Sequence, residues 1–258
     1  MKRLSTLLVL LWCAQLGAVS AAPRVLRAHV VPIVNQERFL ERVLEPFAAA
    51  RGIRLEVTPV HGREVARAAR EGRADLVIMH TRFPGRQRLL GDGVISGGDE
   101  VFANPIALLA PAQDPAGVGD ASSAAEAMAR IRAQGACVLE NDLDGLVTLT
   151  RELAGDLACY RRERQAVGLG AVLRASQQGW YTWWGLHPFA MSGQAMRPVV
   201  WPEPALLRPL SAATVSAAPG ARLAADAIAW LRGAEAREAI AAFRLAAFPA
   251  QQAFWPMP

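Results

Sequence analysis

The sequence predicts an α/β protein, because segments with strand and helix periodicity alternate from residue 25 onward. The strands are expected at 25–34, 53–57 and 76–79, and the helices at 37–51 and 63–71. Gly52 and Gly72 stand where the two helices would end, and the run 76–79 is continuously apolar, as in a strand buried on both faces. This order is typical of a parallel sheet covered by helices.

The second half of the chain has a less regular pattern. We expect strands at 106–109 and 136–139 and helices at 146–154, 168–178, 221–232 and 235–243, with one more from Ser122 or Ser123 to Gln134. The segments 85–98 and 179–189 look rich in turns. Residues 198–209 hold four prolines, which predicts a linker or an edge and not a central strand.

The N-terminus has the pattern of a secretory signal peptide. Lys2 and Arg3 precede an apolar stretch from Leu4 to Leu16, and small residues follow it. We expect a signal peptide over residues 1–21, cleaved after Ala21, and a mature protein in the periplasm. The apolar stretch is too short for a spanning helix, and charged residues or prolines interrupt every later apolar run.

Composition and charge exclude several classes of protein. Of the 258 residues, 52% are hydrophobic and 20% are charged, which excludes a disordered chain. The 28 basic residues exceed the 23 acidic ones by a small margin and are spread along the chain, so nucleic acid is not an expected partner. We expect a monomer.

Cys137 and Cys159 are the two cysteines that remain after the predicted leader. In an oxidising compartment two cysteines often pair, so a disulfide between them is a candidate. The alternative is two separate buried thiols.

Four segments occur in an order that is known from one family. Gly72–His80 is similar to a Gly-x-Ala-Asp-Val-x-x-x-His stretch, and Asp99–Val118 looks like a crossover into a second lobe. Gly168–Leu173 with Gly179–Thr182 echoes a Gly-x-Gly-x-x-Leu helix and its turn, and Phe254–Pro256 suits a C-terminal tail. The chain thus resembles the exported solute-binding proteins of tungstate ABC importers.

The resemblance implies a two-lobed, periplasmic-binding-protein-like (type II) fold with two crossover strands. Lobe 1 would comprise residues 22–105 and 206–258, and lobe 2 residues 106–205. A small molecule or ion would bind in the cleft, and an ABC permease would be the only link to the membrane. The resemblance implies neither an enzyme nor a cofactor, and the sequence lacks a nucleophile elbow, a phosphate loop and any metal-ligand spacing.

The chain departs from the family where the family binds its oxyanion. The Thr/Ser cluster after the first strand reads Val30 to Ile33 here, and the second cluster reads Leu139 to Leu146, with Glu140 in place of an arginine. A third stretch, Thr-Asp-Arg-Gly, reads Trp183 to Leu186. Because a glutamate facing a dianion would repel it, we expect a ligand other than tungstate.

Polar and aromatic residues near the expected cleft are the site candidates. Asn35 and Arg63, each on a loop that opens a helix, could donate to a carboxylate, and Trp183 and Trp184 could stack on an organic ligand or pack between the lobes. The full set of candidates is Asn35, His61, Arg63, His80, Asn104, Glu140, Asn141, Asp142, Asp144, Trp183 and Trp184.

Two functions follow from these features. One is a solute-binding protein that closes two lobes on a small ligand and delivers it to a permease. The other is an accessory or sensor protein that uses the same fold to bind a protein partner, and the loss of the hydroxyl clusters favours it. Closure of the lobes on a ligand would distinguish the two.

Overall fold

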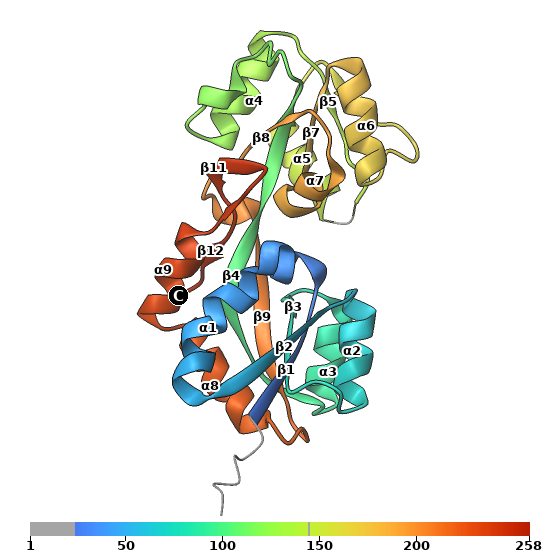
Figure 1. Ribbon diagram of the computed structural model, residues 1–258. Coiled ribbons are helices and arrows are strands. Elements are labelled where there is room, and N and C mark those ends of the chain that lie inside the picture. The colour runs from blue at the N-terminus through green and yellow to red at the C-terminus, as the bar shows by residue number, and fades with distance from the viewer. Residues whose placement is uncertain (1–23, 144) are drawn as a thin grey trace, which may run out of the picture.

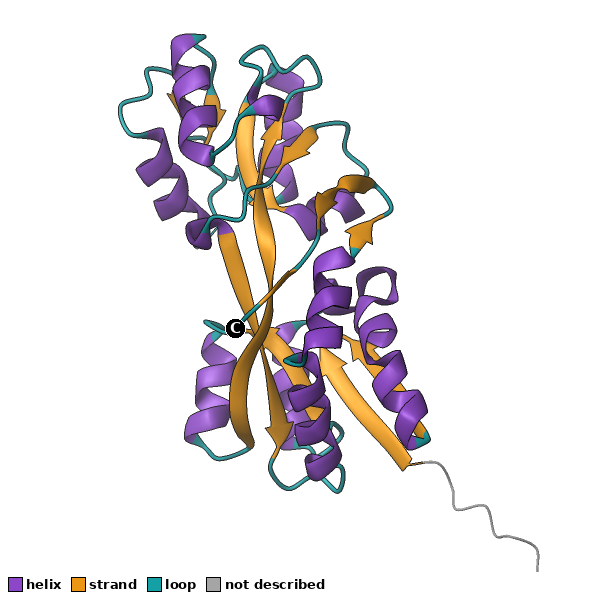
Figure 2. Cartoon of the chain, turned by 90° about the vertical axis from the view of Figure 1, so that its left-hand side faces the viewer, coloured by secondary structure: helices purple, strands orange, loops and turns teal. Residues whose placement is uncertain are grey.

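The computed structural model describes residues 24–143 and 145–258 and has two α/β lobes, one above the other (Figure 1). The predicted signal peptide and Asp144 lie outside the described residues. Two long strands run between the lobes and twist around each other (Figure 2). The α/β class and the two crossover strands expected from the sequence are confirmed.

Lobe 1 is built around the predicted β-α-β-α-β unit. Strand β1 (Arg24–Val30) lies between β2 (Ile53–Pro59) and β3 (Leu76–His80), all parallel. The helices of this lobe are α1 (Phe39–Arg51), α2 (Gly62–Arg70), α3 (Pro84–Gly91), α8 (Ala221–Leu231) and α9 (Ala234–Ala242). Helix α1 buries the apolar stripe that predicts it, with five such residues in the core, from Phe39 to Phe47.

Strands β4 (Ile95–Ala110) and β9 (Leu207–Val215) connect the lobes. They pair antiparallel from Ile95 to Pro105, and from Ile106 onward β4 pairs with the lobe 2 strands β7 (Tyr181–Gly185) and β8 (Arg197–Val199). Since β9 also pairs antiparallel with β3, the parallel strands of lobe 1 end on the side that faces lobe 2.

Three segments differ from the sequence prediction. The stretch 85–98 contains most of α3 and the start of β4, and 179–189 contains β7 and part of α7 (Leu186–Ser192). The proline-rich segment contains the edge strand β8, but it also enters the central strand β9, which includes Pro209. The carbonyl of Pro209 accepts from the Thr81 N–H (3.0 Å). The N–H that proline lacks would point to the same side, just beyond the end of β3, so no bond to β3 is lost.

Lobe 2 places helices around a short sheet. Strand β5 (Val138–Leu139) lies between β6 (Tyr160–Arg161) and β7 and is parallel to both. The main helices are α4 (Ala124–Ala133), α5 (Leu146–Ala154) and α6 (Leu169–Gln178). A disulfide joins Cys137 to Cys159, each directly before one of the paired strands, with the Cα atoms 4.6 Å apart.

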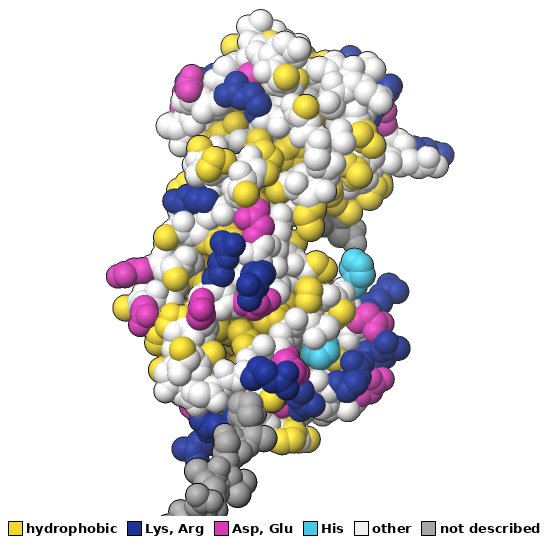
Figure 3. All heavy atoms as spheres, viewed as in Figure 1, with side chains coloured by type: hydrophobic (Ala, Val, Ile, Leu, Met, Phe, Trp, Pro, Cys, Tyr) yellow, Lys and Arg dark blue, Asp and Glu magenta, His cyan; other side chains and the backbone are white. Residues whose placement is uncertain are grey.

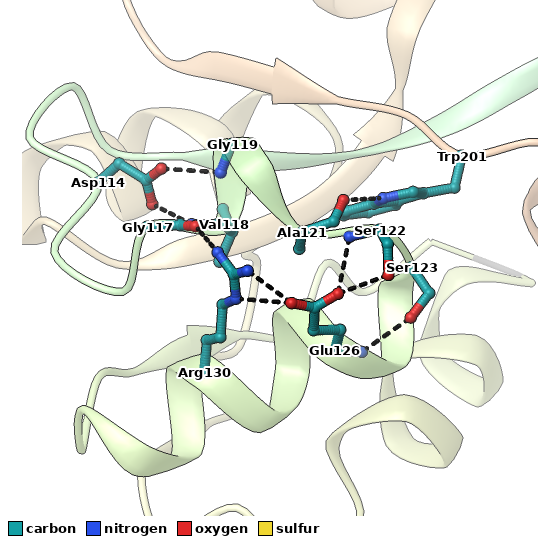
Figure 4. A network of polar contacts seen from close by, with 10 residues as sticks. All are labelled: Asp114, Gly117, Val118, Gly119, Ala121, Ser122, Ser123, Glu126, Arg130 and Trp201. Atoms are coloured by element: carbon teal, nitrogen blue, oxygen red, sulfur yellow. Dashed lines mark hydrogen bonds and ion pairs between the residues drawn. The ribbon is translucent and has the colours of Figure 1, made fainter.

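The start of α4 is fixed by a network of polar contacts (Figure 4). Ser123 is the N-cap, because its hydroxyl accepts from the backbone N–H of Glu126 (3.1 Å). The Glu126 carboxylate accepts from the hydroxyl and N–H of Ser122, and Arg130 donates to Glu126 and to the Gly117 carbonyl. These bonds lower the pKa of Glu126 to about 2. The network stabilises the fold of lobe 2.

The C-terminal segment 244–258 contacts both lobes. It contains β10 (Arg244–Leu245), β11 (Phe248–Gln252) and β12 (Trp255–Pro256), and β12 pairs with β4. Phe254 is buried in lobe 1, stacked on Phe39 with ring centroids 3.9 Å apart. Phe248 stacks on Phe189 of α7, which belongs to lobe 2 (5.5 Å). We call this segment the C-terminal strap.

Candidate ligand-binding site

The site is sought where the parallel strands of lobe 1 end, because ligands of such sheets bind beyond the carboxyl ends of the strands. The loops that follow β1, β2 and β3 lie on the side that faces lobe 2. Figure 3 shows the surface hollowed between the two lobes there.

Three polar side chains lie on one face of the crossover. Asn104 of β4 and Arg208 of β9 are register partners, so their side chains project from the same face. His80, the last residue of β3, pairs with Leu210, two residues along β9 from Arg208, and therefore shares that face. The guanidinium of Arg208 donates through Nη2 to the carbonyl of Gly145 (2.9 Å), at the start of α5 in lobe 2.

The crossover carries positive charge that no described acid neutralises. Burial lowers the pKa of Arg208, and the nearby charge of Arg82 lowers it further, although a guanidinium stays charged. Burial likewise lowers the pKa of His80, with a second contribution from Arg208. Within residues 24–143 and 145–258, no carboxylate lies within ion-pair distance of Arg82 or Arg208. A half-buried cation without an acid attracts an anion.

Two asparagines in this region have unused hydrogen-bonding capacity. Asn104 is 4% exposed, and its Oδ1 has no partner among the described residues. Asn35 donates through Nδ2 to Glu41 (2.9 Å), while its buried Oδ1 also lacks a described partner. Buried polar groups are normally paired, so these two carbonyl oxygens are available to a hydrogen-bond donor.

Glu140 does not behave as its place in the sequence suggests. Its buried carboxylate accepts from Arg151 Nε (2.8 Å) and from the Tyr160 hydroxyl, and Arg162 Nε lies 3.4 Å away. Burial raises the pKa of Glu140, but the bonds from Arg151 and Tyr160 and the charge of Arg162 outweigh it and hold the pKa below its usual value. Because two arginines neutralise this acid inside lobe 2, it does not present a free negative charge to a ligand.

Asn141 and Trp183 have structural partners. The fully buried Asn141 accepts from the Gly168 N–H (2.7 Å) and donates to the carbonyls of Trp183 (3.2 Å) and Gly168 (3.3 Å), which fixes the start of α6 to β7. Trp183 is wholly buried and packs against Trp201 in the core of lobe 2. Trp184 is only half-buried.

The remaining candidates lie on loops. His61 and Arg63 are exposed at the start of α2, and Asp142 is exposed after β5. None of these three side chains bonds to any residue that the structure describes. The structure thus brings His80 and Asn104 together with Arg208 and Arg82, two residues that the sequence prediction missed. Arg208 lay in the segment interpreted as a linker, and only its assignment to a central strand could have found it.

Metal ligands and membrane spans were also sought in the described ranges. Among these residues, no group of three or more His, Cys, Asp and Glu side chains could hold a metal ion. No helix in 24–143 or 145–258 is long and apolar enough to cross a membrane.

No family model matches the sequence, and no curated protein matches it. Solved structures do match. The tungstate binding protein TupA from Desulfovibrio alaskensis G20 is 20% identical, with a TM-score of 0.64 over 91% of this chain and 99% of that one. The tungstate ABC transporter from Geobacter sulfurreducens is 21% identical, with a TM-score of 0.58 over 85% and 98%.

A third match is a full-length variant of OxyR from Pseudomonas aeruginosa, 14% identical, with a TM-score of 0.50 over 86% of this chain and 73% of that one. The structural neighbours are therefore binding proteins and domains of transcription regulators, not enzymes. The resemblance seen in the sequence is confirmed at the level of the fold: the chain has the two-lobed α/β fold of type II periplasmic binding proteins.

Proposed function

We propose that this protein is an exported binding protein that holds a small anion between its lobes and delivers it to an ABC-type permease. The observation that carries the proposal is Arg208, a half-buried cation at the crossover without a described acid partner. The fold supports it, because two of the structural neighbours are described by their names as tungstate proteins. The disulfide agrees with an oxidising compartment outside the cytoplasm.

Binding would use the position of Arg208 between the lobes. Its guanidinium has five N–H donors, of which the contacts to Gly145 and Ala205 use two. The remaining donors can form a bidentate pair with an anion. Asn104, the register partner of Arg208, can add its side-chain Nδ2 as a donor, since this nitrogen bonds to no described residue. An anion held there touches the loop that starts α5, so binding would favour closure of lobe 2 onto lobe 1.

One observation favours the second candidate, an accessory or sensor protein that binds a protein partner. The C-terminal strap contacts α7 of lobe 2 through Phe248 and lies in lobe 1 through Phe254. A segment that holds both lobes opposes a large hinge motion, and a receptor that cannot close would serve a partner better than a transporter.

The test is ligand binding by the chain from Ala22 onward. Calorimetry would measure tungstate, molybdate, phosphate, sulfate and small carboxylates against the wild type, Arg208→Gln and Arg88→Gln. Arg88 is the matched control, because it is exposed on α3 and its side chain bonds to no described residue. We expect saturable binding of at least one anion, weakened tenfold or more by Arg208→Gln and unchanged by Arg88→Gln.

Two results would count against the proposal. Unchanged binding in a folded Arg208→Gln variant would move the site elsewhere. Absence of binding across the panel would favour the protein partner.

Asp144→Asn is a further variant for the same measurement. Asp144 precedes Gly145, which Arg208 contacts, and removal of that acid should not weaken anion binding.

A further inference from the structure

We infer that the anion is the carboxylate of an organic molecule with an apolar body, and not an inorganic oxyanion. This inference rests on the proposed function and specifies the class of ligand. It follows from three features of the cleft: the loops of lobe 1, the hydroxyl groups at the strand ends, and the facing surface of lobe 2.

The loops of lobe 1 present apolar side chains at the ends of the parallel strands. Ile33 follows β1, Val60 follows β2 and Phe83 follows β3, and each is half-buried against the core. A Cβ added at Gly62 would lie 3.3 Å from the Phe83 ring, so this ring covers the first residue of α2. The helix start that could bind an oxyanion is therefore beneath an aromatic ring.

The hydroxyl groups next to the strand ends already have partners. The Thr81 hydroxyl, directly after β3, lies 2.7 Å from that of Ser211. The Thr182 hydroxyl in β7 donates to the Leu139 carbonyl (2.9 Å). A tetrahedral dianion must replace its water shell with many hydrogen-bond donors. Because these hydroxyls already bond to other groups, the binding of an inorganic dianion is weakened most.

Lobe 2 faces this region with a second apolar surface. A Cβ added at Gly168 would lie 3.9 Å from both Leu143 and Trp184, so these two side chains lie together at the start of α6. Val167 and Leu169, on either side of Gly168, are 43% and 40% exposed. Figure 3 shows hydrophobic side chains over the part of the upper lobe beside the hollow. The polar Asn141 at this place is fully paired and offers nothing to a ligand.

These surfaces fit an organic acid. The polar groups are concentrated at the crossover, where Arg208, His80 and Asn104 share one face. A carboxylate needs one guanidinium and one or two further donors, and an apolar body would lie between the loops of the two lobes. An inorganic oxyanion would leave those apolar surfaces in contact with water.

The experiment is a series of straight-chain carboxylates from acetate to octanoate, with benzoate, tungstate and molybdate, measured by calorimetry on the chain from Ala22 onward. We expect affinity to rise about fourfold per methylene until the space is filled, and tungstate and molybdate to bind more weakly than octanoate. The alcohols of the same lengths are the uncharged controls and should bind at least tenfold more weakly.

Variants separate the two ends of the ligand. Arg208→Gln should weaken every carboxylate by a similar factor, whereas Trp184→Ala and Leu143→Ser should reduce the gain per methylene and leave acetate unchanged. Leu173→Ala, one turn further along α6 and exposed, is the matched control. Two different substitutions in lobe 2 keep the test valid if one variant fails to fold.

The outcomes distinguish this inference from the proposed function. Tungstate that binds more tightly than any carboxylate, or an affinity that does not change with chain length, would overturn the organic class and leave an anion receptor. If no anion of either kind binds, the proposed function itself fails.

Discussion

The imidazole of His187, in lobe 2, lies 2.9 Å from the side-chain oxygen of Gln36 in lobe 1, and its other nitrogen lies 2.9 Å from the carbonyl of Ala253 in the C-terminal strap. One buried ring thus contacts both lobes and the strap. Phe254 packs against the same ring, with centroids 4.3 Å apart. These contacts make His187 the centre of the interface between the lobes on this side.

His187 should make stability depend on pH. Burial lowers its pKa to about 4, below the value of ~6.5 in an unfolded chain. Between these values the unfolded chain binds a proton that the folded protein excludes. The free energy of unfolding is therefore unaffected by this group above about pH 6.5. Between pH 6.5 and 4 it falls by roughly 1 kcal/mol for each unit by which the pH is lowered.

Urea denaturation at several pH values between 7.5 and 4.5 measures this contribution. His187→Gln should be less stable at pH 7.5, but its stability should fall less steeply than that of the wild type. His29 and His80 are also shifted to lower pKa, so the His187 contribution is the difference between the two slopes. His61→Gln, at an exposed position, is the control; equal slopes for wild type and His187→Gln would contradict the prediction.

Asp75 connects three elements of lobe 1. Its buried carboxylate accepts from the N–H of Arg27 (2.9 Å), from the Arg27 guanidinium (2.7 and 3.0 Å) and from the N–H of Gly220 (3.2 Å) before α8. Burial raises the pKa of Asp75, but the bonds from Arg27 outweigh it, so the pKa is lowered and the acid is charged at neutral pH. The Gly-x-Ala-Asp motif therefore serves the fold.

Asp75→Asn should lower the free energy of unfolding by roughly 1.5–3 kcal/mol, because it removes charge-assisted bonds from a buried acceptor. Glu56→Gln, which breaks an exposed ion pair with Arg54, should cost less than about 1 kcal/mol. Denaturation at pH 7 compares the two variants. Similar losses in both would show that the charged bonds of Asp75 contribute no more than an exposed ion pair does.

The sequence predicted the elements whose periodicity comes from burial on one face. The first strands and α1 show this: each has an apolar pattern, and α1 also ends at Gly52, so local physics decides these elements. Strand β9 was missed because Pro209 and small residues such as Ala212 and Ala213 give little strand signal, although tertiary pairing on both sides buries them.

The candidate site was only partly predictable for the same reason. The partner of Glu140 is Arg151, eleven residues later on α5, and sequence comparison cannot show that the two side chains meet inside lobe 2. Arg208 became visible only after β9 was known to be a central strand, since the register with Asn104 places both on one face. The direction of a side chain depends on packing, and a sequence motif gives no information on packing.

Removal of the disulfide should destabilise lobe 2. Cys137 and Cys159 are 22 residues apart in sequence, and a loop of this size corresponds to about 3 kcal/mol in the chain-entropy model. The variant with both cysteines changed to serine should melt several degrees lower than the oxidised wild type, and reductant should lower the melting temperature of the wild type alone. If reductant does not change the melting temperature of the wild type, the prediction of a stabilising disulfide is contradicted.

Glu140→Gln tests whether this acid acts on the ligand or on the fold. Because Arg151 and Arg162 neutralise its carboxylate, we expect a loss of about 1–3 kcal/mol in the free energy of unfolding and less than a twofold change in anion affinity. Asp142→Asn, at an exposed position on the same loop, should change neither stability nor affinity by a comparable amount. A tenfold gain in affinity for a dianion in Glu140→Gln would show that the acid does face the cleft and repels a dianion there, as its place in the sequence suggests.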